Sequence, residues 1–365
     1  MLPAIPDDLA ELLRAFEFRR IPFETLVSRL AAAKIPESLH ALSSSVAPGQ
    51  ARAVHALPKP GSGEEAALRA QGESMIARGE LATVVLAGGM ATRFGSTVKA
   101  LARIFDDRDV RFIDAKQHDV ARHGGGRVEL ALMTSFATHD ALGAALGEHV
   151  RRVPQFVSLR VAPSGELFRD AAGRPSPHAT GHGDLPEALA TSGTLDRWKR
   201  QGVRTVLVSN VDNVAATVDP VVFAMHRSLG ARITVELVDK KPGDRGGIPV
   251  NYDGRLVLAE AFRLPHGFPQ DDFPMFNTNT LWIDLNALEG EMPWTWCVAR
   301  KKVDGREAIQ FERLVGELTW WQPSAYLRVE REGPASRFLP VKDLEELGRS
   351  RAAIEAVLAQ RLGLN

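Results

Sequence analysis

The sequence predicts an α/β fold in which helices cover both faces of one sheet. From residue 81 onward, short apolar runs with β-branched residues alternate with stretches of helical periodicity. Most of the strand candidates are apolar along their whole length, which is typical of strands buried on both faces. Before residue 81 the pattern is mostly helical. In an α/β sheet the ligand binds at the carboxyl ends of the strands, so that edge is where we expect a functional site.

The predicted elements follow from these runs in chain order. The strand candidates are 82–87, 128–133, 156–161, 203–209, 232–238, 255–260, 279–285 and 325–330. Helices are expected between several of them, at 113–123, 138–149, 185–200 and 219–229. Residues 241–275 hold many Pro, Gly and Asp residues, which predicts a long loop with short strands.

The first eighty residues and the last twenty flank this pattern. Residues 7–46 predict two helices, because acidic residues open the segment and apolar residues recur at helical spacing. A linker rich in Pro and Gly and a third helix, 64–78, lead into the first strand. We therefore divide the chain into a helical N-terminal segment (1–80), a central domain (81–341) and a C-terminal amphipathic helix (342–365).

Composition excludes several classes of protein. Lys+Arg and Asp+Glu are both 45, so the formal net charge is zero and neither nucleic acid nor an anionic membrane is expected as a partner. The single cysteine, Cys297, has no metal-ligand spacing around it and is expected to be a packed thiol. The N-terminus does not resemble a signal peptide and no apolar run is long enough to span a bilayer. We therefore expect a cytoplasmic protein.

A glycine turn follows the first strand of the central domain. Gly88 and Gly89 end an apolar run, and Arg93 and Lys99 come soon after. Glycines let backbone N–H groups approach a ligand closely, and the two cations suit phosphate. The spacing matches neither the dinucleotide fingerprint nor the Walker A loop, so an ordinary turn between strand and helix is the alternative.

Two further strings combine local structure with possible chemistry. GHGD at 181–184 places His182 beside the start of a helix, where an anion would be favoured. Asp184 followed by Glu187 also has the pattern of a helix capping box. RFLPVK at 337–342 ends in Lys342 after an apolar run, where a solvated lysine is the ordinary interpretation.

Polar strings also follow or begin later strands. SNVDN at 209–213 places Asp212 at the carboxyl edge of the sheet, where one carboxylate is a suitable Mg²⁺ ligand if substrate phosphates complete the shell. FNTNT at 276–280 puts Asn277 and Asn279 on one face of a strand, where their amides could bind sugar hydroxyls. Turns that satisfy their own polar groups are the alternative for both strings.

The order of these strings resembles one family. LxGG…TR…K, LMTSFATHD (132–140), GHGD, SNVDN, FNTNTLW and RFLPVK occur in the order typical of the UDP-sugar pyrophosphorylases, and the eukaryotic-type UTP–glucose-1-phosphate uridylyltransferases are the most similar branch. The similarity covers residues 81–344. It implies a Rossmann-like nucleotidyltransferase (GT-A-like) fold with a mixed sheet, and transfer of a uridylyl group from UTP to a sugar-1-phosphate.

The resemblance also implies a role for individual residues. Mg²⁺ is the implied cofactor, with Asp212 as its ligand, and Arg93, Lys99 and Lys342 would act on the phosphates. The residues implied in nucleotide binding are Gly88, Gly89, Met133, Gln155, Gly181 and His182, among which Gln155 would contact the uracil edge. Those implied in sugar binding are Asn210, Glu260, Asn277 and Asn279.

This chain departs from the family pattern at several points. It has Ala91 where the family usually has Gly, Val98 where the family has Pro, and a shorter string at 240–247, KKPGDRGG. It ends some twenty residues after RFLPVK, so no C-terminal β-helical domain is expected.

Rival interpretations therefore stay open. Glucose-1-phosphate is the expected substrate, and N-acetylglucosamine-1-phosphate or a broader set of sugar-1-phosphates is the runner-up. A non-catalytic nucleotide-sugar-binding relative is the rival from another class, and a dinucleotide-dependent oxidoreductase fails for want of the glycine fingerprint.

Overall fold

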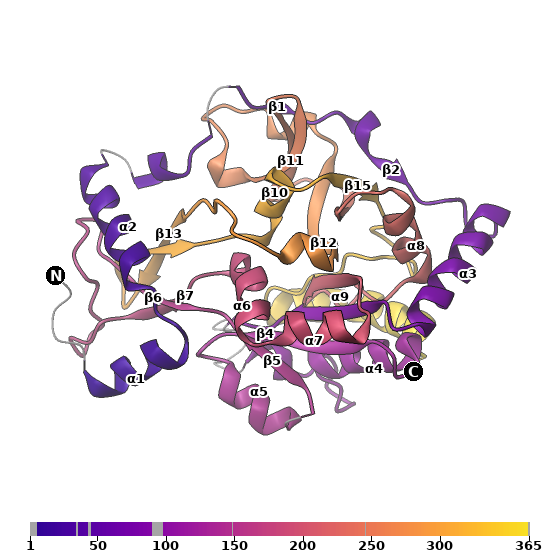
Figure 1. Ribbon diagram of the computed structural model, residues 1–365, viewed down its shortest axis with the longest axis horizontal. Helices are drawn as coiled ribbons and strands as arrows, with labels where there is room; N and C mark the ends of the chain where they lie inside the picture. The colour runs from indigo at the N-terminus through magenta and orange to yellow at the C-terminus, as the bar shows by residue number, and fades with distance from the viewer. Residues whose placement is uncertain are drawn as a thin grey trace.

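The computed structural model describes residues 6–33, 36–42, 45–89, 98–147, 149–244 and 246–363. Its centre is an eight-stranded sheet with the strand order β2–β15–β9–β12–β8–β3–β4–β5 (Figure 1). The strands are β2 (His55–Ala56), β3 (Leu81–Leu86), β4 (Glu129–Thr134), β5 (Arg151–Pro154), β8 (Thr205–Asn210), β9 (Ile233–Asp239), β12 (Met275–Asp284) and β15 (Ser324–Arg328). All neighbours pair in parallel except β12, which runs antiparallel to both β8 and β9. The predicted mixed α/β sheet is therefore confirmed.

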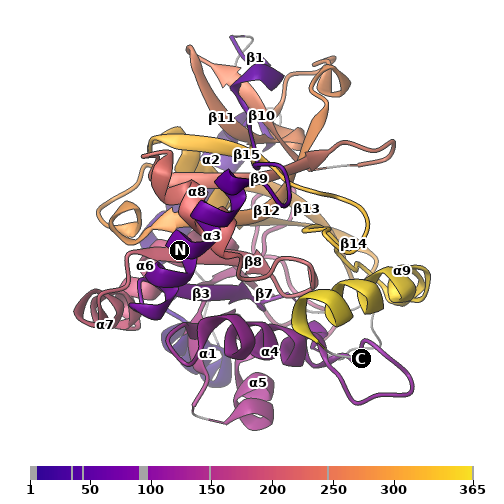
Figure 2. The same cartoon turned by 90° about the vertical axis from the view of Figure 1, so that its right-hand side faces the viewer.

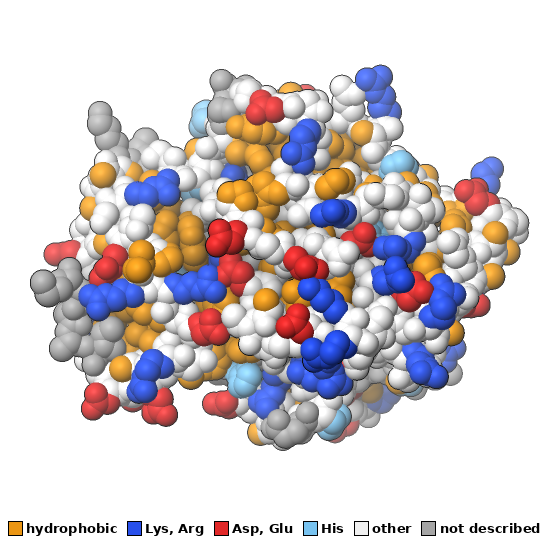
Figure 3. Space-filling view, viewed as in Figure 1, with side chains coloured by type: hydrophobic (Ala, Val, Ile, Leu, Met, Phe, Trp, Pro, Cys, Tyr) orange, Lys and Arg blue, Asp and Glu red, His pale blue; other side chains and the backbone are white. Residues whose placement is uncertain are grey.

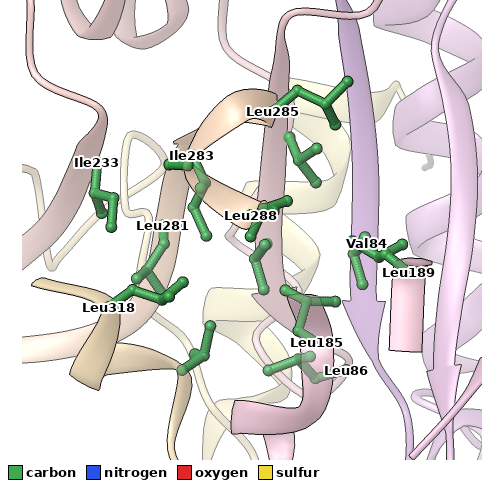
Figure 4. Close-up of a cluster of buried hydrophobic side chains, with 14 of the residues drawn as sticks. Val84, Leu86, Leu185, Leu189, Ile233, Leu281, Ile283, Leu285, Leu288 and Leu318 are labelled. Atoms are coloured by element: carbon green, nitrogen blue, oxygen red, sulfur yellow. The ribbon is translucent and has the colours of Figure 1, made fainter. Parts of the chain in front are cut away.

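One face of this sheet is covered by α6 (Leu185–Thr191), α7 (Thr194–Gln201) and the 3₁₀ helices η8 (Leu285–Leu288) and η9 (Val315–Trp320). Val84 and Leu86 of β3 point to this side and lie beside Leu189 and Leu185, and Leu318 belongs to the same cluster, next to Leu281 (Figure 4). These side chains come from segments far apart in the sequence, so the core forms only when the sheet and its covering helices assemble.

The opposite face is covered by α3 (Gly63–Ala77), α4 (Phe112–Gly124), α5 (His139–Leu146), α8 (Pro220–Ser228) and α9 (Leu344–Val357). Leu81 and Val85 of β3 pack into this layer, because successive side chains of a strand point to opposite faces. Burial on both sides explains why these strands are apolar throughout.

Smaller sheets extend from the central one. β1 (Ala47–Pro48), β10 (Gly247–Tyr252) and β11 (Arg255–Glu260) form a three-stranded sheet, seen at the top of Figure 2. β13 (Cys297–Val303) pairs with β14 (Arg306–Glu312), and β6 (Val157–Leu159) pairs with β7 (Pro177–Ala179). The N-terminal helices α1 (Asp7–Ala15) and α2 (Arg20–Ala32) pack on β6, β13 and β14, away from the central sheet.

The predicted elements agree with the structure except in particular places. The helix expected over 185–200 is two helices, because Gly193 lies between them with φ +69°. The strand expected from 279 begins at 275. β5, β13 and β14 were not predicted, and β13 (CVARKKV) is too rich in exposed charge to resemble a buried strand. β10 is one of the short strands expected within 241–275. Cys297 is buried and unpaired, as expected.

The described helices contain no candidate for a membrane span, because none combines sufficient length with sufficient apolar character.

Candidate functional site

The carboxyl ends of β3, β4, β5 and β8 meet at one edge of the sheet. Leu86 of β3 pairs with Met133 on one side and with Asn210 on the other. The residues that follow each strand therefore lie next to one another at this edge. β12 runs in the opposite direction and brings its first half, with Asn277 and Asn279, to the same place.

The glycine turn after β3 lies directly against Gln155. A Cβ atom built on Gly88 would be 3.0 Å from the amide group of Gln155, whereas one built on Gly89 would have no atom of the described residues within 4 Å. The hydroxyl of Ser135 donates to the carbonyl of Gly88 at 2.7 Å and holds the turn in place. A side chain at Gly88 would therefore push against the Gln155 amide, whereas one at Gly89 would meet none of the described residues.

Met133 lies beneath this turn. Its side chain has no exposed surface and packs with Leu86 in the core. The backbone N–H of Ala87 donates to its carbonyl at 2.8 Å. The structure thus brings Met133 next to the turn but directs its side chain into the protein.

Lys99 and Asp212 form an ion pair at this edge. Nζ of Lys99 lies 2.8 Å from Oδ2 of Asp212 and 3.0 Å from the carbonyl oxygen of Val341. Lys342 is the next residue, it is exposed, and its own N–H donates to Glu346 at 2.6 Å. The third predicted cation, Arg93, lies outside the described residues, as does Ala91.

The predicted sugar-binding residues form a second group. Nδ2 of Asn279 donates to Oδ1 of Asn210 at 2.9 Å, and the backbone N–H of Asn279 donates to Oδ1 of Asn277 at 3.0 Å. The register between β12 and β9 shifts here, and Asn279 has φ +56°, a conformation that asparagine tolerates better than most residues. This bulge turns the amides together at the edge of the sheet.

Glu260, the last residue of β11, faces this group of amides. A Cβ atom built on Gly247 would be 2.9 Å from a carboxyl oxygen of Glu260 and 3.3 Å from Nδ2 of Asn277, so both side chains border the same glycine. Burial raises the pKa of Glu260 to about 7, and the nearby Arg263 offsets this only in part. Glu260 therefore changes between a hydrogen-bond donor and an acceptor-only group near neutral pH.

His182 is held by a backbone contact. The N–H of Val315 donates to its Nδ1 at 2.9 Å, and burial lowers the pKa of His182 to about 4. Because Nδ1 is the acceptor, the proton of the neutral ring resides on Nε2. His182 can therefore offer phosphate a neutral N–H donor and not a positive charge.

The predicted capping box at GHGD is wrong. Asp184 is fully buried and makes no cap; it accepts hydrogen bonds from Nε and Nη2 of Arg313 at 2.9 and 2.5 Å, and from the N–H of Phe156 at 3.0 Å. Glu187 pairs with Arg313 and Arg19. Desolvation makes an unpaired buried carboxylate costly, so the arginine determines where Asp184 points.

The glycines of GHGD also serve packing. Cβ atoms built on Gly181 or Gly183 would collide with the backbone of Arg313, and Gly181 has φ +94°. The position that a Cβ atom of Gly181 would take is therefore already occupied by the backbone of Arg313.

Sequence patterns missed a buried cation beneath the Asp212 loop. Lys116 of α4 is buried, and its Nζ donates to the carbonyls of Asn213 and Ala216, both at 2.6 Å. Burial lowers its pKa to about 8. Ile113 and Lys116 lie on the same face of α4. A lysine on the apolar face of a helix was the sequence signal that could have indicated this buried cation.

The RFLPVK string is anchored to the same loop. Arg337 is buried, and its guanidinium pairs with Glu236 at 2.8 and 2.6 Å. The side chain of Asn213 donates to the carbonyl of Arg337 at 3.1 Å and accepts from the N–H of Leu339 at 2.8 Å. These contacts place Val341 and Lys342 beside Asp212, although more than one hundred residues separate them in the sequence.

The arrangement combines two kinds of binding group. Lys99 and Lys342 suit charged phosphates, Asp212 suits a cation that accompanies them, and the amides with Glu260 suit hydroxyl groups of a sugar. The described residues include no cluster of three or more His, Cys, Asp or Glu side chains that could hold a metal. Asp212 alone fits Mg²⁺ in the way one carboxylate does when phosphates supply other ligands.

Comparison with known proteins identifies the family of this chain. The family model described as UTP–glucose-1-phosphate uridylyltransferase matches residues 44–354. The UTP–glucose-1-phosphate uridylyltransferase of Saccharomyces cerevisiae is 29% identical over 304 residues, which cover 76% of this chain and 60% of that one. A counterpart from Dictyostelium discoideum is 26% identical over 293 residues, or 73% of this chain and 57% of the other. The chain thus spans about three-fifths of the length of the curated relatives it matches.

Solved structures show the same fold. The UDP-glucose phosphorylase of Trypanosoma brucei superposes with a TM-score of 0.74 at 21% identity, covering 93% of this chain and 77% of that one. The family match covers residues 44–354, which is most of the chain. It includes every string that carries the predicted site and leaves out the N-terminal helices α1 and α2. The chain therefore belongs to the UTP–glucose-1-phosphate uridylyltransferase family.

Proposed function

We propose that this chain transfers a uridylyl group from UTP to glucose-1-phosphate and releases pyrophosphate. The contact of Lys99 with both Asp212 and the Val341 carbonyl is the observation that supports it most directly, because it assembles three separate segments at one point. The polar edge formed by Asn210, Asn277 and Asn279 then lies next to a cluster of charge, as a sugar phosphate requires.

The chemistry demands alignment more than proton transfer. The phosphate of glucose-1-phosphate is already ionised at neutral pH, so its oxygen attacks the α-phosphorus of UTP without a general base. Lys99 and Lys342 reduce the repulsion between the two anions, and His182 donates a neutral hydrogen bond. Gln155, whose amide group borders Gly88, would contact the base.

Asp212 is the residue that would hold Mg²⁺. When bound, Mg²⁺ supplies neutralisation of the charge shared between the phosphates. The Asp212 carboxylate pairs with Lys99 through Oδ2 at 2.8 Å, and the same carboxylate would hold the metal.

The test is release of pyrophosphate from UTP with Mg²⁺ and a panel of sugar-1-phosphates, with ATP, CTP, GTP and dTTP as controls. We expect release with UTP and glucose-1-phosphate. Release with N-acetylglucosamine-1-phosphate or with several sugars would retain the reaction and change the substrate. A folded protein that binds UTP and releases nothing with any sugar would refute catalysis and favour a binding protein.

A matched pair of variants tests the metal ligand. Asp212→Asn should lower kcat by about 10²-fold or more, as expected for loss of a preorganised electrostatic group. Asp253→Asn removes an exposed carboxylate at the β10–β11 turn and should leave kcat unchanged. Full activity in the Asp212 variant would contradict the assignment.

A further inference from the structure

An arginine-lined cleft lies apart from the candidate site. It has a volume of about 880 Å³ and begins at the amino ends of β3, β4 and β8, formed there by Gly79, Val128 and Val203. It continues along the edge strand β5 to α5. None of its lining residues belongs to the predicted nucleotide, sugar or metal site.

The charge of this cleft is unusual for a chain whose net charge is zero. Its described lining includes five arginines and two histidines but a single carboxylate, Glu129; the arginines are Arg78, Arg127, Arg151, Arg152 and Arg197. Figure 3 shows Lys and Arg side chains gathered over α7 and the strands beside it. Concave surfaces lined by charge of one sign concentrate ligands of the opposite sign.

Glu129 organises the arginines without neutralising them. Nε of Arg151 donates to one of its carboxyl oxygens at 2.9 Å, and Nε of Arg197 donates to the other at 3.2 Å. One negative charge is therefore shared by two guanidinium groups, and each of them contacts Glu129 through its Nε atom. The terminal Nη groups of both arginines donate to no residue in the described part of the chain, which leaves donors for another partner.

The other arginines have different surroundings. Arg152 donates from Nη1 to the carbonyl of His139 at 3.1 Å, and Arg78 pairs with Glu80 at 2.7 Å. The side chain of Arg127 is exposed, and its guanidinium group has no hydrogen-bond or ion-pair partner among the described residues. The cleft thus contains both oriented donors and an unpaired positive charge.

We propose that this cleft binds a small polyanion that carries two or more phosphate groups. A guanidinium group matches phosphate oxygens in geometry and charge. A ligand that contacts several guanidinium groups around one cavity therefore needs more than one phosphate group. A volume of about 880 Å³ is in the range of small-molecule sites. This binding is separate from the proposed uridylyl transfer and does not depend on it.

The experiment titrates the full chain with inorganic tripolyphosphate by calorimetry, in buffer of low ionic strength. Two double variants remove positive charge from the cleft. The first combines Arg78→Gln with Arg127→Gln, both at exposed side chains, and the second combines Arg127→Glu with Arg197→Glu. Each should weaken binding about tenfold or more, because a hydrogen bond between charged groups is lost at each position. Binding to the wild-type chain should also weaken as salt rises.

Two controls separate this cleft from other cationic sites. Arg29→Glu reverses an exposed charge on α2 and should bind tripolyphosphate as the wild type does. Lys99→Met removes a cation of the candidate nucleotide site; it should lower only the binding that belongs to that site and keep the binding that the cleft variants lose. Loss of binding in the Lys99 variant alone would overturn the proposal, since the ligand would then occupy the nucleotide site. Unchanged binding in both cleft variants, or no binding at millimolar tripolyphosphate in the wild type, would overturn it as well.

Discussion

Replacing Glu260 by Gln removes a partly buried carboxyl group at the end of β11. Burial raises the pKa of this group from 4.5 to about 7. The opposing charge of Arg263 is shared with Glu317, to which its Nη1 donates at 3.0 Å. Glutamine keeps nearly the same shape but does not titrate, so the substitution isolates the effect of ionisation.

The sign and size of the effect follow from proton linkage. Between pH 4.5 and about 7 the folded chain holds a proton on Glu260 that the unfolded chain has lost. The contribution of Glu260 to stability is therefore fully present below pH 4.5 and is lost as pH rises through 7. At about 1.4 kcal/mol for each pKa unit the whole loss is about 3 kcal/mol. Roughly 2.5 kcal/mol of it falls between pH 5 and pH 8.

The assay compares wild type and Glu260→Gln by urea unfolding at pH 5 and pH 8, monitored by tryptophan fluorescence. The difference in unfolding free energy between the two proteins should shift by about 2.5 kcal/mol in favour of the variant at pH 8. Other titrating groups are common to both proteins and cancel. Glu291→Gln, at an exposed position, is the control and should show no such shift. An unchanged difference for Glu260→Gln would refute the burial argument.

Three further substitutions test the surroundings of the site. Lys116→Met leaves two loop carbonyls without their donor and should lower the unfolding free energy in urea by about 2–6 kcal/mol; a neutral effect would contradict its role. Gly88→Ala should displace Gln155 and weaken UTP binding, measured by calorimetry, whereas Gly89→Ala should leave the stability of the free chain unchanged. Asp184→Asn should cost about 3–5 kcal/mol in the same urea assay, since a buried arginine loses its main carboxylate; a cost near zero would instead fit a helix cap.

Much of the site was predictable because its parts adjoin regular strands. Apolar runs at β3 and β8 are followed at once by Gly88 and by Asp212, and the rule that ligands bind at carboxyl ends of strands joins them at one edge. The hairpin β13–β14 was missed because its exposed charges obscure the strand pattern. Periodicity detects burial, and a strand that is half solvated offers little of it.

Contacts between distant residues were not predictable in the same way. Asp184 and Glu187 have the spacing of a capping box, yet the partner that Asp184 meets is Arg313, 129 residues away. Lys116 binds a carbonyl 97 residues away, at Asn213. Local spacing describes only what neighbours in the chain could do, whereas a buried charge takes the partner that the assembled fold supplies.

The sequence by itself determined the fold class, the family and the order of the polar strings along the chain. Each of these depends on short-range patterns, namely runs of apolar residues and the residues that follow them. Only the tertiary structure decided the state of the functional groups. It made His182 a neutral donor, raised the pKa of Glu260 to about 7 and paired Lys99 with Asp212. Those properties depend on desolvation and on partners from remote segments, and neither exists until the chain has folded.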